Sequence, residues 1–166
     1  MPAMPGLEIT RLGTAQATDP LLALYRRAIA GIDDGLYSKA EKQLWGQWAD
    51  TPERANRMLR QGVTLLATRE GQLLGFGQIM PDYLINMLYV DPNAARQGVG
   101  SALVAVMERI ARRHGAVSLY TRASHASRPL FQRAGFVPEN RELIPAATGI
   151  RIARTVMVKD LRISRR

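Results

Sequence analysis

The sequence predicts an α/β fold in which a mixed, twisted sheet carries helices on both faces. Three strand-like stretches follow one another in the middle of the chain with short turns between them, which indicates antiparallel pairing. Helical and strand-like stretches alternate after that point, and a helical crossover places two strands side by side and parallel. The 166 residues contain no linker or internal repeat, so we expect one domain over 1–166, with its core at about 7–161 and a basic tail at 162–166.

The first third of the chain contains clear helix-start patterns. Asp19 and Pro20 are typical of a helix cap followed by proline in the first turn. Ser38 and Glu41 have the spacing of a capping box, in which each side chain bonds the other residue's backbone N–H. The elements expected here are a strand at 7–12 and helices at 19–32, 38–48 and 51–62.

The remaining elements follow from apolar patterning and from glycine stops. Gly115 and Gly135 each follow a helical pattern and end it. We expect strands at 63–68, 72–80, 83–90, 117–123 and 149–159, and helices at 98–114 and 127–134. The region after the last helix is compatible with one strand or two.

Composition excludes several classes of function. The chain has no cysteine, which removes disulfides, thiolate catalysis and thiolate metal sites. Its two histidines lie in unrelated contexts, so we expect no metal. The apolar runs are much shorter than the ~20 residues of a membrane span, and no secretory pattern begins the chain. We therefore expect a cytoplasmic protein that does not associate with a membrane.

The net charge of +9 raises the alternative of nucleic-acid binding. The arginines are spread over several helices and the tail, however, and no basic ribbon interleaved with aromatic residues is present. This pattern favours solvated helix faces over a nucleic-acid surface. The same field would favour an anionic small ligand.

A glycine-containing loop joins the strand at 83–90 to the helix that follows. Val99, Leu103, Val106 and Ile110 recur at helical spacing, so one face packs on the sheet and the first turn is held beside the strand end. Unpaired N–H groups and the helix dipole favour an anion at that turn. Gly98 and Gly100 would let a phosphate approach the amides, although two glycines can also serve tight packing alone. No lysine follows for a Walker loop, and no third glycine for a dinucleotide fingerprint.

Two stretches resemble the GNAT superfamily of N-acetyltransferases. "VDPNAARQGVGSALV" is similar to its acyl-CoA loop, and "ASHASRPLFQRAGF" is similar to its second motif further along the chain. The order of elements agrees with that superfamily over 7–161. The details look most like a bacterial branch with Phe in place of the general-acid Tyr.

The resemblance implies acetyl-CoA as co-substrate. Its pyrophosphate would lie on the loop amides, with Arg96 reaching toward the 3′-phosphate, and its pantetheine arm would pair with the strand near Leu88. Ala95 departs from the pattern, which has Arg or Gln at that position. The implied cofactor-binding residues are Leu88, Tyr89, Val90, Ala95, Arg96, Gln97, Gly98, Val99, Gly100, Ser101, Ser127 and Phe131. Ser127 could also cap its own helix.

The resemblance also implies catalytic roles, and this chain departs from the superfamily pattern at two of the positions. The backbone N–H of Leu88 is implied as donor to the thioester oxygen. Phe131 cannot protonate a leaving thiolate, so Ser124, Tyr120 or a water would have to do so. Asn86 stands where an Asp would be a base, and Asp82 is the first substitute, ahead of Glu139 and His125.

The acceptor pocket is expected against 33–48, with Tyr37, Trp45 and Asn86 as substrate-binding residues. Asp33 or Asp34 could meet a cationic acceptor, and the tryptophans could equally be the buried face of a helix.

The function implied is direct transfer of the acetyl group to a primary amine, without a covalent enzyme intermediate. The alternative is a catalytically weak or inactive acyl-CoA-binding regulatory module. The identity of the amine stays open, and a homodimer would be in keeping with the superfamily.

Overall fold

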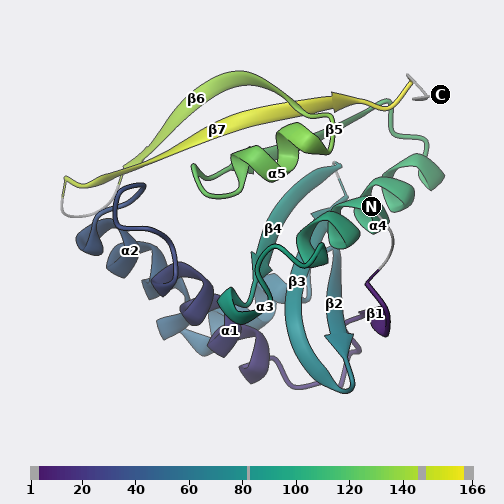
Figure 1. The fold of residues 1–166 in the computed structure, drawn as a ribbon, viewed down its shortest axis with the longest axis horizontal. Helices are drawn as coiled ribbons and strands as arrows, with labels where there is room; N and C mark the ends of the chain where they lie inside the picture. Colours follow the sequence, from purple (N-terminus) through teal and green to yellow (C-terminus); the bar gives the residue numbers. More distant parts are fainter. Residues whose placement is uncertain (1–3, 82, 146–148, 163–166) are drawn as a thin grey trace.

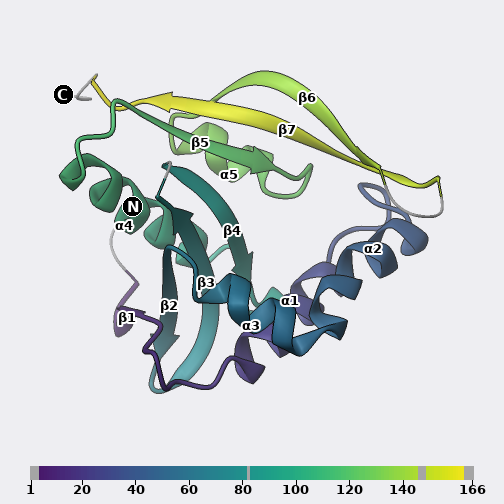
Figure 2. The same cartoon turned by 180° about the vertical axis from the view of Figure 1, so that it is seen from behind.

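A computed structural model describes residues 4–81, 83–145 and 149–162. Within these residues the chain forms a seven-stranded sheet in the order β1-β2-β3-β4-β5-β7-β6, with helices on both faces (Figure 1, Figure 2). All neighbouring strands are antiparallel except β4 and β5, which run parallel. The expected mixed α/β sheet is therefore confirmed.

The strands are β1 (Leu7–Arg11), β2 (Val63–Arg69), β3 (Gln72–Met80), β4 (Leu84–Val90), β5 (Ser118–Ala123), β6 (Val137–Pro145) and β7 (Arg151–Asp160). The helices are α1 (Asp19–Ala30), α2 (Lys39–Gly46), α3 (Pro52–Leu59), α4 (Val99–Arg113) and α5 (Arg128–Arg133), with short 3₁₀ turns η1 (Gln47–Asp50) and η2 (Pro92–Ala94). No helix in these ranges is both long and apolar enough to cross a bilayer.

The helix starts and the strands at the end of the chain agree with the sequence patterns in part. The capping box is confirmed, because the Ser38 hydroxyl accepts the Glu41 N–H at 3.2 Å and the Glu41 carboxylate accepts the Ser38 N–H at 2.7 Å. The expected cap at Asp19 is wrong by one residue. Thr18 precedes α1 and makes no side-chain cap bond, since its hydroxyl donates to Asn56 of α3 at 3.3 Å. The end of the chain forms two strands, β6 and β7.

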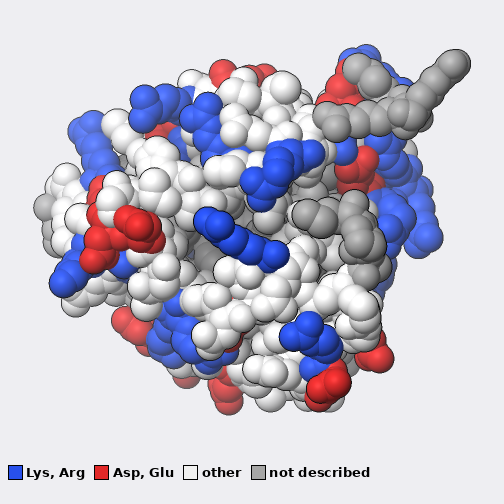
Figure 3. Space-filling model, viewed as in Figure 1, with Lys and Arg blue, Asp and Glu red and all other residues white. Residues whose placement is uncertain are grey.

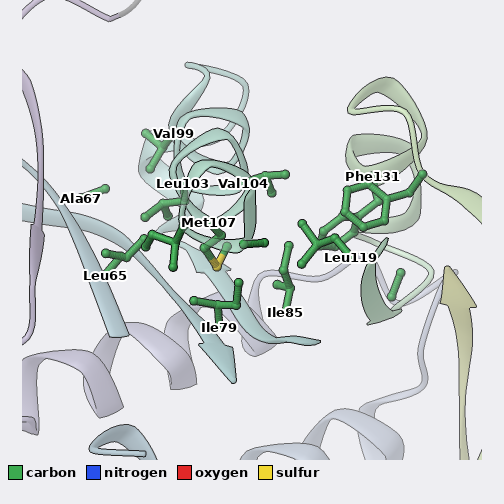
Figure 4. Packing of buried hydrophobic residues seen from close by; sticks show 14 of the residues in the cluster. Leu65, Ala67, Ile79, Ile85, Val99, Leu103, Val104, Met107, Leu119 and Phe131 are labelled. Carbon is green, nitrogen blue, oxygen red and sulfur yellow. The ribbon is translucent and has the colours of Figure 1, made fainter. Parts of the chain in front are cut away.

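Helix α4 packs closely on one face of the sheet. Its buried side chains Val99, Leu103 and Met107 point toward the strands, where they meet Leu65 and Ile79 (Figure 4). The close approach depends on two glycines of β3: a Cβ on Gly75 would lie 3.0 Å from Val99 Cγ1, and one on Gly77 would lie 2.9 Å from Met107 Cε. The opposite face is covered by α1 and α3, around Leu24, Phe76 and Met87.

Strands β4 and β5 separate after a short contact. They pair at only two positions, Leu84 with Tyr120 and Ile85 with Thr121. A bulge also interrupts β4 at Asn86, because Gln78 of β3 is opposite Met87 while Ile79 is opposite Ile85. From Asn86 to Val90 the edge of β4 toward β5 therefore has no strand partner among the described residues, and Figure 1 shows the two strands diverging there.

Candidate functional site

The loop after β4 is held by Asp91, which is 6% exposed. One carboxylate oxygen accepts the Asn93 N–H at 3.0 Å, and the other accepts Nε and Nη2 of Arg27 at 3.1 and 2.8 Å. The Asn93 N–H lowers the pKa of Asp91 below its usual value, and Arg27 adds to this against the opposing effect of burial. Asp91 thus fixes the loop to α1.

The head of α4 is shaped by left-handed backbone. Gly98, which precedes the helix, has φ +83°, and Arg96 has φ 60°. A Cβ on Gly98 would meet no atom within 4 Å, so the space above it is open. The first N–H groups of a helix have no partner within it, and in α4 they directly follow this open position. The arrangement is suited to an anion.

Gly100 also contributes to the packing of two helices. A Cβ at Gly100 would lie 2.6 Å from Cδ1 of Leu130, a residue of α5. Its lack of a side chain therefore leaves room for α5 against the first turn of α4. Among the other predicted loop residues, Ala95, Arg96, Gln97 and Ser101 are exposed, and Val99 is in the core.

A small pocket of about 110 Å³ opens where β4 and β5 separate. It is walled by α2 on one side and by β7 on another, with β4 between them. The predicted acceptor residues Tyr37, Trp45 and Asn86 all line it, together with Ser124 and Tyr89. The structure thus brings together five predicted site residues from distant parts of the chain.

Asn86 is oriented by a directional chain of hydrogen bonds. The Thr64 hydroxyl donates to the Leu59 carbonyl at 2.6 Å, so its oxygen accepts from Nε2 of Gln78 at 3.3 Å. Nε2 of Gln78, which is fully buried, shares its two hydrogens among this oxygen and the carbonyls of Met58 and Gln61. These acceptors place the amide nitrogen of Gln78 on their side, so its Oε1 accepts from Nδ2 of Asn86 at 2.9 Å. Asn86 Oδ1 is left as the acceptor in the pocket.

Ser124 and Ser127 form a reciprocal capping pair. The Ser124 hydroxyl accepts the Ser127 N–H at 3.1 Å, and the Ser127 hydroxyl accepts the Ser124 N–H at 3.0 Å. The expectation that Ser127 caps its own helix is therefore wrong, since α5 receives no cap bond from it. Ser124 is the cap of the turn that leads into α5, and it is the member of the pair that lines the pocket.

The tyrosines in and near the pocket connect separate elements through their hydroxyls and stay protonated. The Tyr37 hydroxyl donates to the Ala153 carbonyl at 2.7 Å and accepts the His125 N–H at 2.8 Å, which joins β7 to the turn before α5. Burial raises the pKa of Tyr89 to about 12, and burial also raises the pKa of Tyr25, whose ring lies 4.7 Å from that of Tyr89. Both phenols keep their protons at neutral pH.

Basic residues do not form one continuous surface on the face viewed in Figure 3. Lys and Arg side chains are separated there by uncharged surface and by acidic groups. In the described part of the chain, no group of three His, Cys, Asp or Glu side chains is arranged to hold a metal ion.

The sequence matches the acetyltransferase (GNAT) family over residues 34–136. The chain belongs to this family. It is 30% identical over 116 residues to the uncharacterized N-acetyltransferase YafP of Escherichia coli K12, a match that covers 70% of this chain and 72% of that protein.

Solved structures support the same GNAT fold. A GCN5-related N-acetyltransferase from Rhodopseudomonas palustris is similar with a TM-score of 0.88 and 27% identity, over 95% of this chain and 98% of that one. The PaiA N-acetyltransferase of Thermoplasma acidophilum, solved with coenzyme A, is similar with a TM-score of 0.72 and 19% identity, over 93% and 98% of the two chains.

Asp82 of this GNAT protein is outside the described residues, and three other candidate residues are not among those that line the pocket. Glu139 is exposed on β6, and His125 stacks on Tyr37 with ring centroids 5.1 Å apart. Phe131 is 2% exposed and packs on Phe136, so its side chain belongs to the core.

The acidic residues expected near the acceptor have other partners. Asp33 accepts the Gly35 N–H at 2.6 Å, and Asp34 pairs with Lys42 at 2.7 Å. The pocket contains residues that sequence reasoning missed, namely Arg122 and Arg154, with Gln78 behind Asn86. A glutamine inside the apolar stretch "LLGFGQIM" was a usable indication of a buried polar network, whereas the arginines have no comparable pattern.

Proposed function

We propose that this GNAT protein is an N-acetyltransferase that moves the acetyl group of acetyl-CoA directly to a primary amine. The observation that carries the proposal is the unpartnered edge of β4, which runs from the open head of α4 to the pocket. One continuous path thus runs from the head of α4, which suits an anion, to the small pocket. Acetyl-CoA has a charged end, an extended amide arm and a small acyl group in that order.

The chain's residues would hold the co-substrate chiefly through backbone groups. The N–H groups from Arg96 to Ser101 would bind the pyrophosphate, with the helix dipole adding to the attraction. The edge of β4 near Leu88 and Val90 would pair with the pantetheine amides as an added strand does. The exposed guanidinium of Arg96 would meet the 3′-phosphate.

Catalysis would rest on position and on polarisation of the thioester. The N–H of Leu88 would donate to the oxygen that gains negative charge, and Asn86 Oδ1 would accept from the amine and aim its lone pair. The amine nitrogen would bond to the thioester carbon, and the C–S bond would break as the oxygen gives up its added charge. The amine would lose one proton and the departing sulfur would gain one, through solvent or a side chain. The chain has no cysteine to carry a covalent intermediate.

Proton transfer in this chain would not use the aromatic residue of the second motif. Phe131 has no proton to give, as in the bacterial branch that the motif resembles. A thiol has a pKa near ~8.5, so a thiolate leaves with modest help. Ser124, at the pocket wall, and the protonated Tyr89 would be the side-chain donors available there. Asp82 stays a candidate base.

A second candidate function is an acyl-CoA-binding module without turnover. Asn86 and Phe131 favour it, because neither can move a proton. Calorimetric titration with acetyl-CoA, CoA and ATP, followed by thiol release with a panel of amines, separates the two. Micromolar acetyl-CoA binding with thiol release supports the enzyme. Binding without release to any amine favours the module, and failure to bind any CoA species contradicts both.

A further inference from the structure

The acceptor side of the pocket carries an excess of positive charge. Arg122 of β5 and Arg154 of β7 line it, and Glu142 of β6 borders an adjoining hollow of about 200 Å³ that Arg122 also lines. Among the described residues that line these two hollows, Glu142 is the only carboxylate. Two guanidiniums and one carboxylate leave one positive charge in excess.

The sheet holds these three side chains on one face. Glu142 and Arg154 are directly opposite each other in the β6–β7 pair, and Arg122 is opposite Val156, two residues further along β7. Residues two apart on a strand share a face. The three charges therefore form one cluster beside the pocket, and the strand pairing sets their spacing.

Glu142 does not use up the donors of the two arginines. Its Oε2 lies 2.8 Å from Nε of Arg154 and 3.6 Å from Nε of Arg122. Each guanidinium has five N–H groups, and in the described part of the chain these pairings engage only the Nε–H. The terminal NH₂ groups remain for a ligand. The side chain of Arg122 is 44% exposed and that of Arg154 is 32% exposed. Planar guanidinium forks match a carboxylate in two-bond geometry.

Among the described residues, a cationic acceptor finds no comparable partner. Asp33 and Asp34 bond Gly35 and Lys42 as described above, and Glu142 is already neutralised. The rest of the wall is apolar or neutral and includes Trp45, Ile144 and Ile152. A polyamine would bring more positive charge toward two arginines.

We propose that the acceptor is a small amine that also carries a carboxylate, bound by the terminal N–H groups of Arg122 and Arg154. Its amine would lie against Asn86 Oδ1, and any apolar side chain against the isoleucines and Trp45. The inference rests on the proposed acetyl transfer and narrows its substrate to amino-acid-like molecules. The volume of about 110 Å³ is small beside the ~300–1,000 Å³ of drug-sized sites, which suits such an acceptor.

The first test compares amine acceptors that have a carboxylate with acceptors that lack one. Thiol release from acetyl-CoA is measured with apolar L-amino acids, with their primary amides, and with spermidine. We expect kcat/KM for the best acid to exceed that for its amide by about tenfold or more, the loss of one charge-assisted pair. Equal or better rates with the amides or with spermidine would overturn the inference and leave acetyl transfer itself standing.

The second test uses variants whose effects have opposite signs. Arg154→Gln and Arg122→Gln should each lower the acid-to-amide ratio of kcat/KM, whereas Glu142→Gln should raise it by removing a negative charge that repels the acceptor's carboxylate. A loss of activity in Glu142→Gln would make that carboxylate the acceptor's partner and contradict the proposal. Weaker acetyl-CoA binding in the arginine variants would assign them to the co-substrate and also contradict it. Arg109→Gln, an exposed change on α4, is the matched control.

Binding without turnover gives an independent answer. N-acetyl amino acids and their amides are titrated by calorimetry into the protein saturated with CoA. Tighter binding of the acids, lost in Arg154→Gln, supports the inference even where no thiol is released, in which case only the proposed enzymatic function fails. Equal binding of acids and amides overturns it.

Discussion

The two ends of the candidate site differ in the groups that they present, which are backbone N–H groups at one end and side chains at the other. At the head of α4 the ligand would meet backbone N–H groups, and the left-handed turn at Gly98 determines where they point. In the pocket the ligand would meet side chains from β4, β5, β7 and α2. A backbone site depends on one local conformation, so a short motif can encode it. A side-chain site depends on strands and helices that only the complete fold brings together.

The largest effect is expected from charge at the backbone end. Gly98→Asp and Gly98→Asn both add a side chain that tolerates φ +83°, and open space surrounds the position. The aspartate should weaken acetyl-CoA binding by about 100-fold or more through repulsion of the pyrophosphate, and the asparagine by much less. Calorimetric titration of both variants measures this, with thermal unfolding as the folding control. Equal losses in the two variants would mean that shape and not charge controls this end.

Asn86 tests the side-chain end. Asn86→Ala should lower kcat/KM by about 10- to 100-fold, because the amine loses the acceptor that orients it, while acetyl-CoA affinity stays within about twofold. Asn86→Asp should also lose activity, since its carboxylate would face Oε1 of Gln78, 2.9 Å from the present Nδ2. A gain of activity in Asn86→Asp would show that this position needs a base and that the directional hydrogen-bond chain is not limiting.

The capping serines separate a structural role from a catalytic one. Ser124→Ala and Ser127→Ala each remove half of the reciprocal pair, so each should lower stability by about 1 kcal/mol in urea unfolding. If Ser124 donates the proton to the leaving sulfur, its variant alone should lower kcat by about tenfold or more. Equal kcat values in the two variants would remove Ser124 from the proton path.

The smallest effect is expected at Glu108, which joins α4 to the far half of the sheet. Its carboxylate pairs with Lys159 of β7 at 2.6 Å and with Arg112 at 2.9 Å. Burial alone would raise the pKa of Glu108, but hydrogen bonds from these two cations outweigh it and lower the pKa. A lowered pKa means stability that is present at neutral pH and is lost as the pH falls through the folded-state value.

Glu108→Gln should therefore cost about 1 kcal/mol at pH 7, and the difference from the wild type should shrink in acid. Urea unfolding at several pH values measures this. A difference that does not change with pH would show that packing, not charge, is lost. Acetyl-CoA affinity should not change, since Glu108 lies on α4 two turns beyond the loop.

Local patterns in the sequence were enough for much of the fold and for the backbone end of the site. The Ser38 capping box, the strand 72–80 and the loop before α4 each depend on neighbours in sequence, and each lies where expected. Strand β6 was not resolved from the pattern, because most of its residues are exposed and its apolar alternation is weak.

The pocket could be predicted only in part. Trp45 and Asn86 were found through resemblance, and Arg122 and Arg154 were not found at all. Their role depends on a register between β5, β6 and β7 that no short stretch records. Gly100 shows a contact that the motif does not encode, because its missing side chain leaves room for Leu130 of α5.

The two-position contact between β4 and β5 has a consequence for the stability of the folded protein. A sheet with an open edge at its centre lacks hydrogen bonds that a bound pantetheine arm would supply. A ligand that binds only the folded protein raises its free energy of unfolding by RT ln(1 + [L]/Kd), and this gain grows with the ligand concentration. Acetyl-CoA binding should therefore raise the free energy of unfolding of this protein.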